Sequence, residues 1–309
     1  MKLRIGTRGS KLALWQTHYV AEKLRQGGVE TEVIVINTRG DKRQDVAIAE
    51  IGTKGVFTEE IEDQLQRGTI DIGVHSAKDL QSSLPDAFEI IAFTEREEVP
   101  DVLVSHQREI DITSGEPIIV GTSSARRKAL LKHYFPHVQA VEMRGNLQTR
   151  IAKMEAGQCD ALMLAYAGVH RMGYDESIVH RFPIDQITPP VGQGTIALEA
   201  LSNLDDSKRE IIREAVNHSS TEQRLRAERA YLKALRGGCS VPVFALATMQ
   251  ENRLILRGGV VSLDGTTLLM EEISSPGESP EKIGETLAER ILAQGGGEIL
   301  QRIRDGQKS

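Results

Sequence analysis

A chain of 309 residues is long enough for two or three domains, each with its own hydrophobic core. Its 44 acidic and 38 basic side chains give a formal net charge of −6, which excludes proteins that bind nucleic acid or anionic lipid through bulk positive charge. The first residues contain no apolar run of signal-peptide length, and charges interrupt every apolar run before the roughly 18 residues of a membrane span, so we expect a soluble protein without a membrane or nucleic-acid partner.

The beginning of the chain alternates short apolar runs with amphipathic segments. This pattern predicts strands and helices in turn, which is typical of parallel βαβ units. The predicted elements are strands at 3–7, 31–37 and 70–74 and helices at 11–26 and 57–66.

A second series of the same kind follows. A charge run at 95–98 that ends before Pro100 separates it from the first, so the two series predict two α/β units. Its predicted elements are strands at 118–120, 138–143 and 161–164 and helices at 124–134 and 147–155.

The segment after Pro189-Pro190 has no obvious place in the second unit. An apolar run at 195–201 and a helix at 207–216 fit a return of the chain to the first unit, through a second crossing between the two.

The last third has a different pattern, with one helix and three strand-like runs. Asp264-Gly265 between the last two runs is a strong hairpin signal. We expect a small antiparallel sheet covered by a terminal helical region that starts at Pro280 and is broken by the glycines at 295–297. The helix is predicted at 221–235 and the strands at 241–249, 254–261 and 267–273.

Glycine, serine and arginine gather in the turns that follow several predicted strands. At the carboxyl edge of an open α/β sheet such turns form the ligand crevice, and helix N-termini there offer free N–H groups to anions. Ser, Asn and Gly are also common helix caps, and that explanation stays open. Because arginine is a planar, two-pronged partner for carboxylates, the pattern favours a ligand with several carboxylates. The arginines concerned are Arg8, Arg126, Arg127, Arg144, Arg150 and Arg171.

Ionisable residues follow the predicted strand at 70–74 directly. Asp79 at a strand end is a candidate for proton transfer or for stabilising a developing cation, and a surface ion pair between Lys78 and Asp79 is the alternative. His75, with apolar neighbours, is interpreted as a hydrogen-bonded structural residue.

The two cysteines have different surroundings. Cys239 lies in a glycine-rich turn after Arg236, which could present a reactive thiolate. Cys159, just before Asp160-Ala161-Leu162, is expected inside an element and is interpreted as structural. Two isolated cysteines make no disulfide framework, fit a reducing compartment and, with eight scattered histidines, give no metal-ligand spacing. We therefore expect a cytoplasmic protein without a metal.

Eight short motifs occur together in the order typical of one enzyme family. In this order the chain resembles hydroxymethylbilane synthase, also called porphobilinogen deaminase, and the resemblance covers essentially the whole length. The motifs are Thr7-Arg8-Gly9-Ser10, Thr38-Arg39-Gly40-Asp41, Lys54-Gly55-Val56-Phe57, His75-Ser76-Ala77-Lys78-Asp79, Gly121-Thr122-Ser123-Ser124-Ala125-Arg126-Arg127, Arg144-Gly145-Asn146, Val191-Gly192-Gln193-Gly194 and Gly237-Gly238-Cys239.

The resemblance implies an α/β fold with two doubly wound domains similar to periplasmic binding proteins and a small α+β domain with a three-stranded antiparallel sheet. The implied domains are residues 1–95 plus 195–215, residues 100–189 and residues 218–309. It also implies a monomeric transferase of tetrapyrrole and heme biosynthesis that joins four porphobilinogen molecules head to tail and releases ammonia.

The resemblance further implies a role for individual residues. Asp79 matches the catalytic carboxylate, and Lys78 beside it is the second implied catalytic residue. Cys239 matches the residue that carries a dipyrromethane cofactor through a thioether bond. The implied cofactor-binding residues are Arg8, Ser10, Lys78, Ser123, Arg126, Arg127, Arg144, Arg150 and Arg171. The implied substrate-binding residues are Arg8, Gln16, Lys54, Arg144, Arg150, Arg171 and Gln193.

Two other functions fit part of the sequence. A two-domain protein that binds an organic anion without catalysis explains the arginine turns but gives Asp79 and Cys239 no role. A thiol-dependent hydrolase uses Cys239 but has no histidine near it in the sequence.

Overall fold

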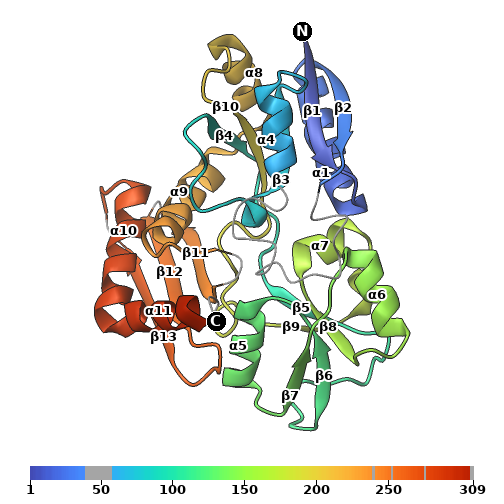
Figure 1. The fold of residues 1–309 in the computed structure, drawn as a ribbon, viewed down its shortest axis with the longest axis vertical. Coiled ribbons are helices and arrows are strands. Elements are labelled where there is room, and N and C mark those ends of the chain that lie inside the picture. The colour runs from blue at the N-terminus through green and yellow to red at the C-terminus, as the bar shows by residue number, and fades with distance from the viewer. Residues whose placement is uncertain (39–57, 239–240, 252, 275, 307–309) are drawn as a thin grey trace. The chain divides into compact units, whose positions relative to one another are not determined.

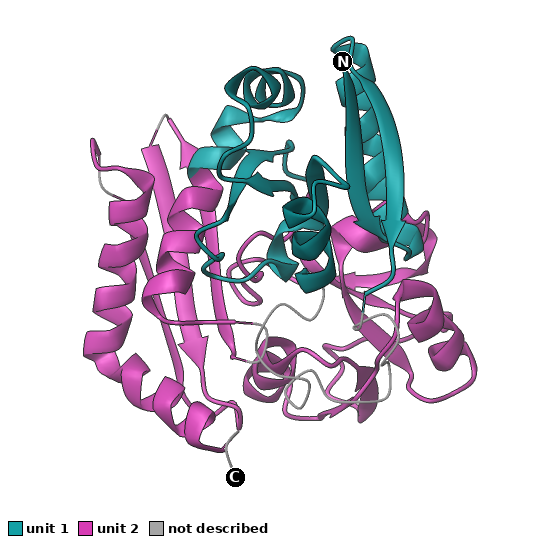
Figure 2. Ribbon diagram, turned by 45° about the horizontal axis from the view of Figure 1, so that its top comes forward, with its two compact units in different colours: residues 1–97, 194–223 teal, residues 98–193, 224–309 magenta. Residues whose placement is uncertain are grey.

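The computed structural model describes residues 1–38, 58–238, 241–251, 253–274 and 276–306. The chain divides into two compact units, one made of residues 1–97 and 194–223 and the other of residues 98–193 and 224–309 (Figure 2). Lys54 and Cys239, both predicted to be functional, lie outside the described residues.

The first unit is built on a mixed five-stranded sheet in the order β2-β1-β3-β10-β4 (Figure 1). β1 runs parallel to β2 and β3, whereas β10 runs antiparallel to both of its neighbours. The predicted return of the chain to this unit is therefore confirmed, in an antiparallel orientation. The strands are β1 (Lys2–Arg8), β2 (Glu30–Ile36), β3 (Ile72–Ser76), β4 (Phe88–Phe93) and β10 (Ile196–Leu201).

Helix α1 (Lys11–Gln26) illustrates why the helices of this unit form where the sequence predicts them. Ser10 caps it by accepting a hydrogen bond from the Ala13 backbone N–H at 3.3 Å. Its buried side chains, among them Val20 and Leu24, recur every three or four residues and therefore face the sheet together. The other helices are α4 (Glu59–Gln66), the short 3₁₀ turn η1 (Ala77–Asp79) and α8 (Asp206–Val216).

The second unit contains a five-stranded sheet of the same kind, in the order β7-β6-β8-β5-β9. β6 is parallel to β7 and β8, and β5 is antiparallel to β8 and β9. In each of the two sheets the antiparallel strand is next to a crossing between the units. The strands are β5 (Asp101–Val104), β6 (Ile118–Gly121), β7 (Val138–Val141), β8 (Ala161–Ala165) and β9 (Ile178–Arg181). The helices are α5 (Ala125–Tyr134), α6 (Leu147–Glu155), α7 (Tyr166–Arg171) and the short turn η2 (Asp175–Ser177).

Three strands were absent from the sequence prediction, namely β4, β5 and β9. β5 and β9 have only four residues each, and β5 begins directly after a charge run and Pro100. A strand this short, without alternation, gives no periodic signal. The predicted parallel pattern is confirmed for β1–β3 and for β6–β8, but it does not hold for β5 and β10.

The remaining sheet is an antiparallel meander in the order β11-β12-β13. The hairpin predicted at Asp264-Gly265 is confirmed: Gly265 has a φ of 76°, and Asp264 Oδ1 accepts a hydrogen bond from the Thr266 backbone N–H at 3.1 Å. The elements are α9 (Ser219–Ala234), β11 (Val243–Gln250), β12 (Arg253–Val261), β13 (Leu268–Ser274), α10 (Pro280–Ile291), a π-helical turn η3 (Leu292–Gly296) that includes Gly295 at a φ of 100°, and α11 (Gly297–Gly306).

This meander packs on the other sheet of its unit through a shared apolar cluster. Phe244 and Val261 of the meander are buried with Leu130 and Val120 of the five-stranded sheet layer. The shared core explains why these residues form one compact unit. The division of the chain into three domains stays a prediction.

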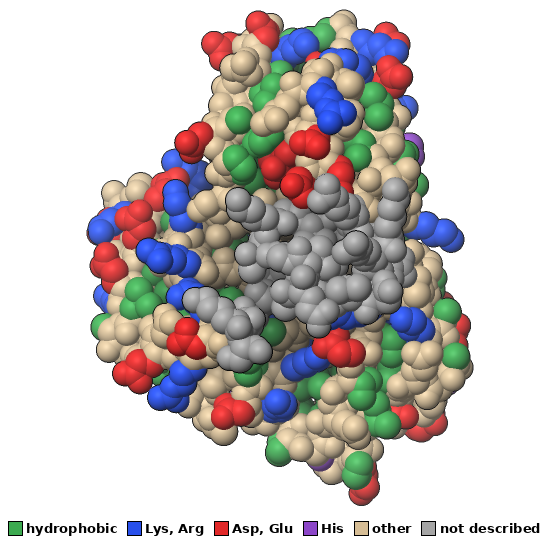
Figure 3. All heavy atoms as spheres, viewed as in Figure 1, with side chains coloured by type: hydrophobic (Ala, Val, Ile, Leu, Met, Phe, Trp, Pro, Cys, Tyr) green, Lys and Arg blue, Asp and Glu red, His purple; other side chains and the backbone are tan. Residues whose placement is uncertain are grey.

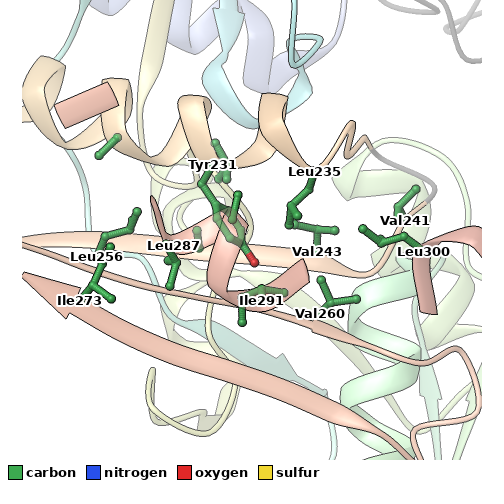
Figure 4. Packing of buried hydrophobic residues seen from close by; sticks show 14 of the residues in the cluster. Tyr231, Leu235, Val241, Val243, Leu256, Val260, Ile273, Leu287, Ile291 and Leu300 are labelled. Atoms are coloured by element: carbon green, nitrogen blue, oxygen red, sulfur yellow. The ribbon is translucent and has the colours of Figure 1, made fainter. Parts of the chain in front are cut away.

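The core between the meander and its helices surrounds Tyr231 (Figure 4). The Tyr231 side chain is fully buried, and burial raises the pKa of its phenol. Its ring packs so closely on the meander that a Cβ at Gly258 would lie 3.0 Å from the Tyr231 Cζ atom. The hydroxyl has no hydrogen-bond partner among the described residues.

We predict that Tyr231→Phe raises the thermal stability of the protein. Removing a buried hydroxyl without a partner should increase the free energy of unfolding by about 1 kcal/mol, since the desolvation penalty is lost and the ring contacts stay. Thermal denaturation measures this, with Leu287→Ala as the control that should cost about 2–5 kcal/mol in the same core. A lower melting temperature for Tyr231→Phe would contradict the prediction.

Candidate active site

In the first unit, a small cavity lies at the edge of the sheet where β1 and β3 end. Because the two strands are parallel neighbours, their last residues meet at this edge. The cavity is lined by Arg8, Ser10, Gln16 and Asp79, together with His75 and Ser76. The cavity thus brings together Arg8 and Ser10 of one sequence motif, Asp79 of another and Gln16 of α1.

The polar groups of this cavity are held by neighbouring elements. Gln16 of α1 donates from Nε2 to Ser76 Oγ at 2.9 Å, which ties the helix to the end of β3. Asp79 lies on η1, half-buried, and forms no ion pair with Lys78 or any other described residue. The alternative of a Lys78–Asp79 surface ion pair is therefore not what the structure shows. A half-buried carboxylate without a cation partner is available to a cationic ligand.

One of the residues that line the cavity, His75, makes a buried contact with a glutamate that the sequence did not predict. His75 Nε2 lies 3.0 Å from Glu199 Oε2, and both side chains are at least 96% buried. The hydrogen bond predicted for His75 is not found at Nε2 among the described residues, and the contacting glutamate comes from β10, which the sequence could not place beside β3. Glu62 of α4 lies close enough to both residues to interact electrostatically.

The pKa of Glu62 is raised by this environment. Burial disfavours the charged carboxylate, and the negative charge of Glu199 acts in the same direction. A group whose pKa is raised in the folded state stabilises the fold below its unfolded pKa of about 4.3, and loses that contribution as pH rises through its folded pKa.

We predict that Glu62→Gln increases the melting temperature at pH 8 and that this gain disappears near pH 4. The amide stays neutral at pH 4 and at pH 8. The parent carboxyl is neutral at low pH, but its ionisation in the buried site costs stability as the pH rises. Melting curves at pH 4, 6 and 8 measure the effect. Asp63→Asn, an exposed position on the same helix, is the matched control and should show no such pH-dependent gain. A gain for Glu62→Gln that is equal at all three pH values would contradict this explanation.

In the second unit, three predicted ligand-binding side chains converge on one buried carboxylate. Asp101 Oδ2 accepts from Arg126 Nη2 at 2.5 Å, and Asp101 Oδ1 accepts from Arg127 Nη2 at 2.7 Å. Gln193 Nε2 donates to the same Oδ1 at 3.0 Å. Burial alone would raise the pKa of Asp101, but the charges of the two arginines outweigh it and hold this pKa well below the usual range.

This arrangement corrects the expectation of an open arginine lining. The Arg126 and Arg127 side chains are only 4% and 8% exposed, and each donates one further hydrogen bond to a backbone carbonyl. Gln193 is fully buried and also donates to the Val99 carbonyl, so the structure does not place its amide at a ligand surface. Asp101 was missed because it opens a strand that the sequence did not indicate.

The other predicted arginines of this unit lie at the ends of α6 and α7 and are half-buried. Arg144 contacts Glu142, with 3.4 Å between Nε and Oε2, and Arg150 donates from Nε to the Gly145 carbonyl at 2.8 Å. Arg171 lies in the last turn of α7. Ser123 donates from Oγ to the Met143 carbonyl at 2.8 Å.

The turns also act as helix caps. Ser124 accepts from the Arg127 backbone N–H, and Asn146 accepts from the Thr149 backbone N–H at 2.9 Å. The capping explanation is thus confirmed for the Ser and Asn residues, and the arginines beside them have separate contacts.

The described residues of the turn before Cys239 end at Gly238. Arg236 has a φ of 49°, an uncommon left-handed conformation for a side chain other than glycine. A Cβ atom added at Gly238 would have no neighbouring atom within 4 Å among the described residues. Cys159 is buried, and burial raises the pKa of its thiol, which fits the structural role predicted for it.

Across the described part of the chain, no helix is long and apolar enough to span a membrane, and no group of three potential ligands could hold a metal ion. On the face shown in Figure 3, acidic and basic side chains are interspersed. A surface depression at α8 is lined by charged residues, of which Arg209 and Arg213 already pair with Glu89 and Glu222.

Comparison with known proteins gives full-length matches. The family model described as "Porphobilinogen deaminase, dipyromethane cofactor binding domain" matches residues 3–209, and "Porphobilinogen deaminase, C-terminal domain" matches residues 222–293. The porphobilinogen deaminase of Desulfosudis oleivorans is 54% identical over 308 residues, which cover 99% of each chain. That of Cytophaga hutchinsonii is 53% identical and covers 98% of this chain and 97% of that one.

Among solved structures, the VFT2 domain of Bordetella pertussis BvgS is 15% identical, with a TM-score of 0.43. The match covers 74% of this chain and 92% of that one. The family assignment rests on the sequence matches alone.

Proposed function

The chain belongs to the porphobilinogen deaminase family, and from that premise we propose how its residues carry out the reaction. The activity is that of hydroxymethylbilane synthase, a transferase of tetrapyrrole biosynthesis that joins four porphobilinogen molecules into linear hydroxymethylbilane and releases ammonia. The observation that carries the residue assignment is the cavity that places Asp79 beside Arg8, Ser10 and Gln16.

The arginines meet the main physical demand of this reaction, which is to bind many carboxylates. Each porphobilinogen carries an acetate and a propionate, so a two-ring primer and four added rings present twelve carboxylates. A protein with a net charge of −6 needs local positive charge to hold them. We assign this role to Arg8, Arg144, Arg150 and Arg171, with Lys54 as a further substrate contact.

The residues of the second unit fit a dipyrromethane cofactor. The Nε atoms of Arg126 and Arg127 are buried and have no acceptor among the described residues, so each can donate to a carboxylate of the group. We propose that Cys239 holds it through a thioether, and that Ser10, Lys78, Ser123 and the arginines bind it. When bound, the dipyrromethane supplies the pyrrole carbon to which the first substrate unit is joined.

Asp79 is the proposed catalytic carboxylate. Loss of ammonia from porphobilinogen leaves a cation that is delocalised onto the pyrrole nitrogen, and a fixed carboxylate near that nitrogen lowers its energy. Asp79 follows the buried strand β3 on a short 3₁₀ turn, so its backbone is held rigidly. With no cation partner among the described residues, its charge is available to the substrate. Lys78 beside it is proposed to bind a substrate carboxylate.

We predict that Asp79→Asn lowers the rate of chain extension by at least about 100-fold, because the amide keeps the size of the side chain but removes its charge. Single-turnover mass spectrometry on folded, primer-loaded protein measures the rate. Asp86→Asn, an exposed aspartate of the same unit, is the matched control and should extend the chain at the parent rate. Extension by Asp79→Asn at near the parent rate would exclude the catalytic assignment.

We predict that the intact protein is heavier than its sequence by two linked pyrrole units, and that Cys239→Ser removes this excess. A thioether needs the sulfur of Cys239, and serine offers no equivalent nucleophile. Mass spectrometry of the intact chain measures the excess, and Cys159→Ser, a change at the buried thiol, should keep it. A fully active protein without added mass would refute the role of Cys239.

A cytoplasmic, monomeric protein that serves heme biosynthesis is the remaining part of the proposal. Two cysteines in 309 residues, one of them needed as a thiol, fit a reducing compartment. Sedimentation of the purified chain tests the monomeric state.

A further inference from the structure

We propose that Asp101 is a positioning residue for the cofactor: its carboxylate orients Arg126 and Arg127 so that both can receive carboxylates of the dipyrromethane. This inference rests on the proposed function, because it takes the two arginines as cofactor-binding residues. It adds a residue that touches neither substrate nor cofactor and acts through the arginines.

The hydrogen bonds fix both guanidinium groups. In Arg126, Nη2 is held by Asp101 and Nη1 donates to the Thr188 carbonyl at 2.9 Å; in Arg127, Nη2 is held by Asp101 and Nη1 donates to the Met163 carbonyl at 2.9 Å. Because a guanidinium is planar, two fixed nitrogens also fix the direction of the third. In both arginines that third nitrogen, Nε, is buried without an acceptor among the described residues.

The charges of the cluster do not balance. One carboxylate faces two guanidinium groups, and no other described carboxylate lies within ion-pair distance of either arginine. A buried cluster with one positive charge in excess is costly unless an anion completes it. The excess charge and the two free Nε donors therefore point to the same kind of ligand, a carboxylate.

The position of Asp101 follows from the direction of β5. Asp101 is the first residue of this strand and pairs with Ala165, the last residue of β8. Because β5 runs antiparallel to β8, it begins at the edge where the parallel strands end, which is the ligand edge of such a sheet. Backbone hydrogen bonds from Tyr166 to the Pro100 carbonyl and from Phe182 to the Asp101 carbonyl hold it on both sides.

The geometry of α5 explains why the side chain that carries the carboxylate must be short and fixed in position. Arg126 and Arg127 are consecutive residues in the first turn of α5, so their side chains leave the helix about 100° apart. Both reach the same carboxylate, one at each oxygen. A carboxylate displaced by one methylene cannot keep both contacts without moving at least one arginine.

The test compares Asp101→Glu with the parent, because glutamate keeps the charge and changes only the position. The fraction of folded protein that carries the added mass of the dipyrromethane is measured by intact mass after expression and after incubation with porphobilinogen. We expect acquisition of that mass to be at least about tenfold slower, since a misplacement of about 1 Å can cost up to 100-fold in such assemblies. The folded fraction is measured on the same samples, because a purely structural role would lower that fraction and leave the rate of acquisition by the folded protein unchanged.

Two further variants separate positioning from stability. Asp160→Asn alters a carboxylate of the same unit that accepts from the Ile119 backbone N–H at 2.7 Å, and it should acquire the cofactor at the parent rate even if its melting temperature falls. Asp101→Asn removes the charge as well as one acceptor and should acquire less cofactor than Asp101→Glu in its folded fraction.

The outcomes distinguish this inference from the proposed function. Asp101→Glu that loads as fast as the parent, or that fails to fold at all, overturns the positioning role, because the carboxylate would then act only on stability or not at all. A parent protein that carries no added mass and joins no porphobilinogen overturns the proposed function itself, whatever the Asp101 variants do.

Discussion

The interior of the second unit depends on one carboxylate. Asp101 is fully buried between two guanidinium groups that would otherwise repel each other in a medium of low dielectric constant. It lowers the cost of burying Arg126 and Arg127 but leaves one positive charge uncompensated among the described residues. The cluster can therefore be buried and still attract an anion. An exposed arginine would not be fixed in position, and a fully neutralised ion pair would not attract an anion.

The topology of the sheets delivers this carboxylate to the right place. Where the chain crosses between the units it contributes β5 to one sheet and β10 to the other, each antiparallel to its neighbours. Each of these strands starts at the edge of the sheet where the parallel strands end. The first residues after each crossing therefore lie at the edge where such sheets bind ligands. In the first unit the same arrangement places Glu199 of β10 against His75 of β3, which lines the cavity.

Much of this was predictable from the sequence, and the exceptions share one cause. Helices α1 and α6, the strands β1 and β6 and the Asp264-Gly265 hairpin carry local signals, namely periodicity, caps and turn residues. The cavity residues Arg8 and Asp79 were predicted because parallel strands share an edge. Asp101 and Glu199 were not, because each lies on a strand whose paired neighbours are far away along the chain. A local sequence pattern does not predict which arginine will form an ion pair with a given aspartate.

The two units hold charge in different ways, and the proposed mechanism uses both. A carboxylate proposed to stabilise a pyrrole cation must not form an ion pair with an arginine, because an ion pair such as that of Asp101 would already satisfy it and hold it away from the substrate. Asp79 meets this condition in the first unit, where the described residues give it no ion pair. An arginine that binds carboxylates must be oriented before the ligand arrives, because an unrestrained side chain loses conformational freedom on binding. Arg126 and Arg127 meet that condition in the second unit, at the expense of one aspartate.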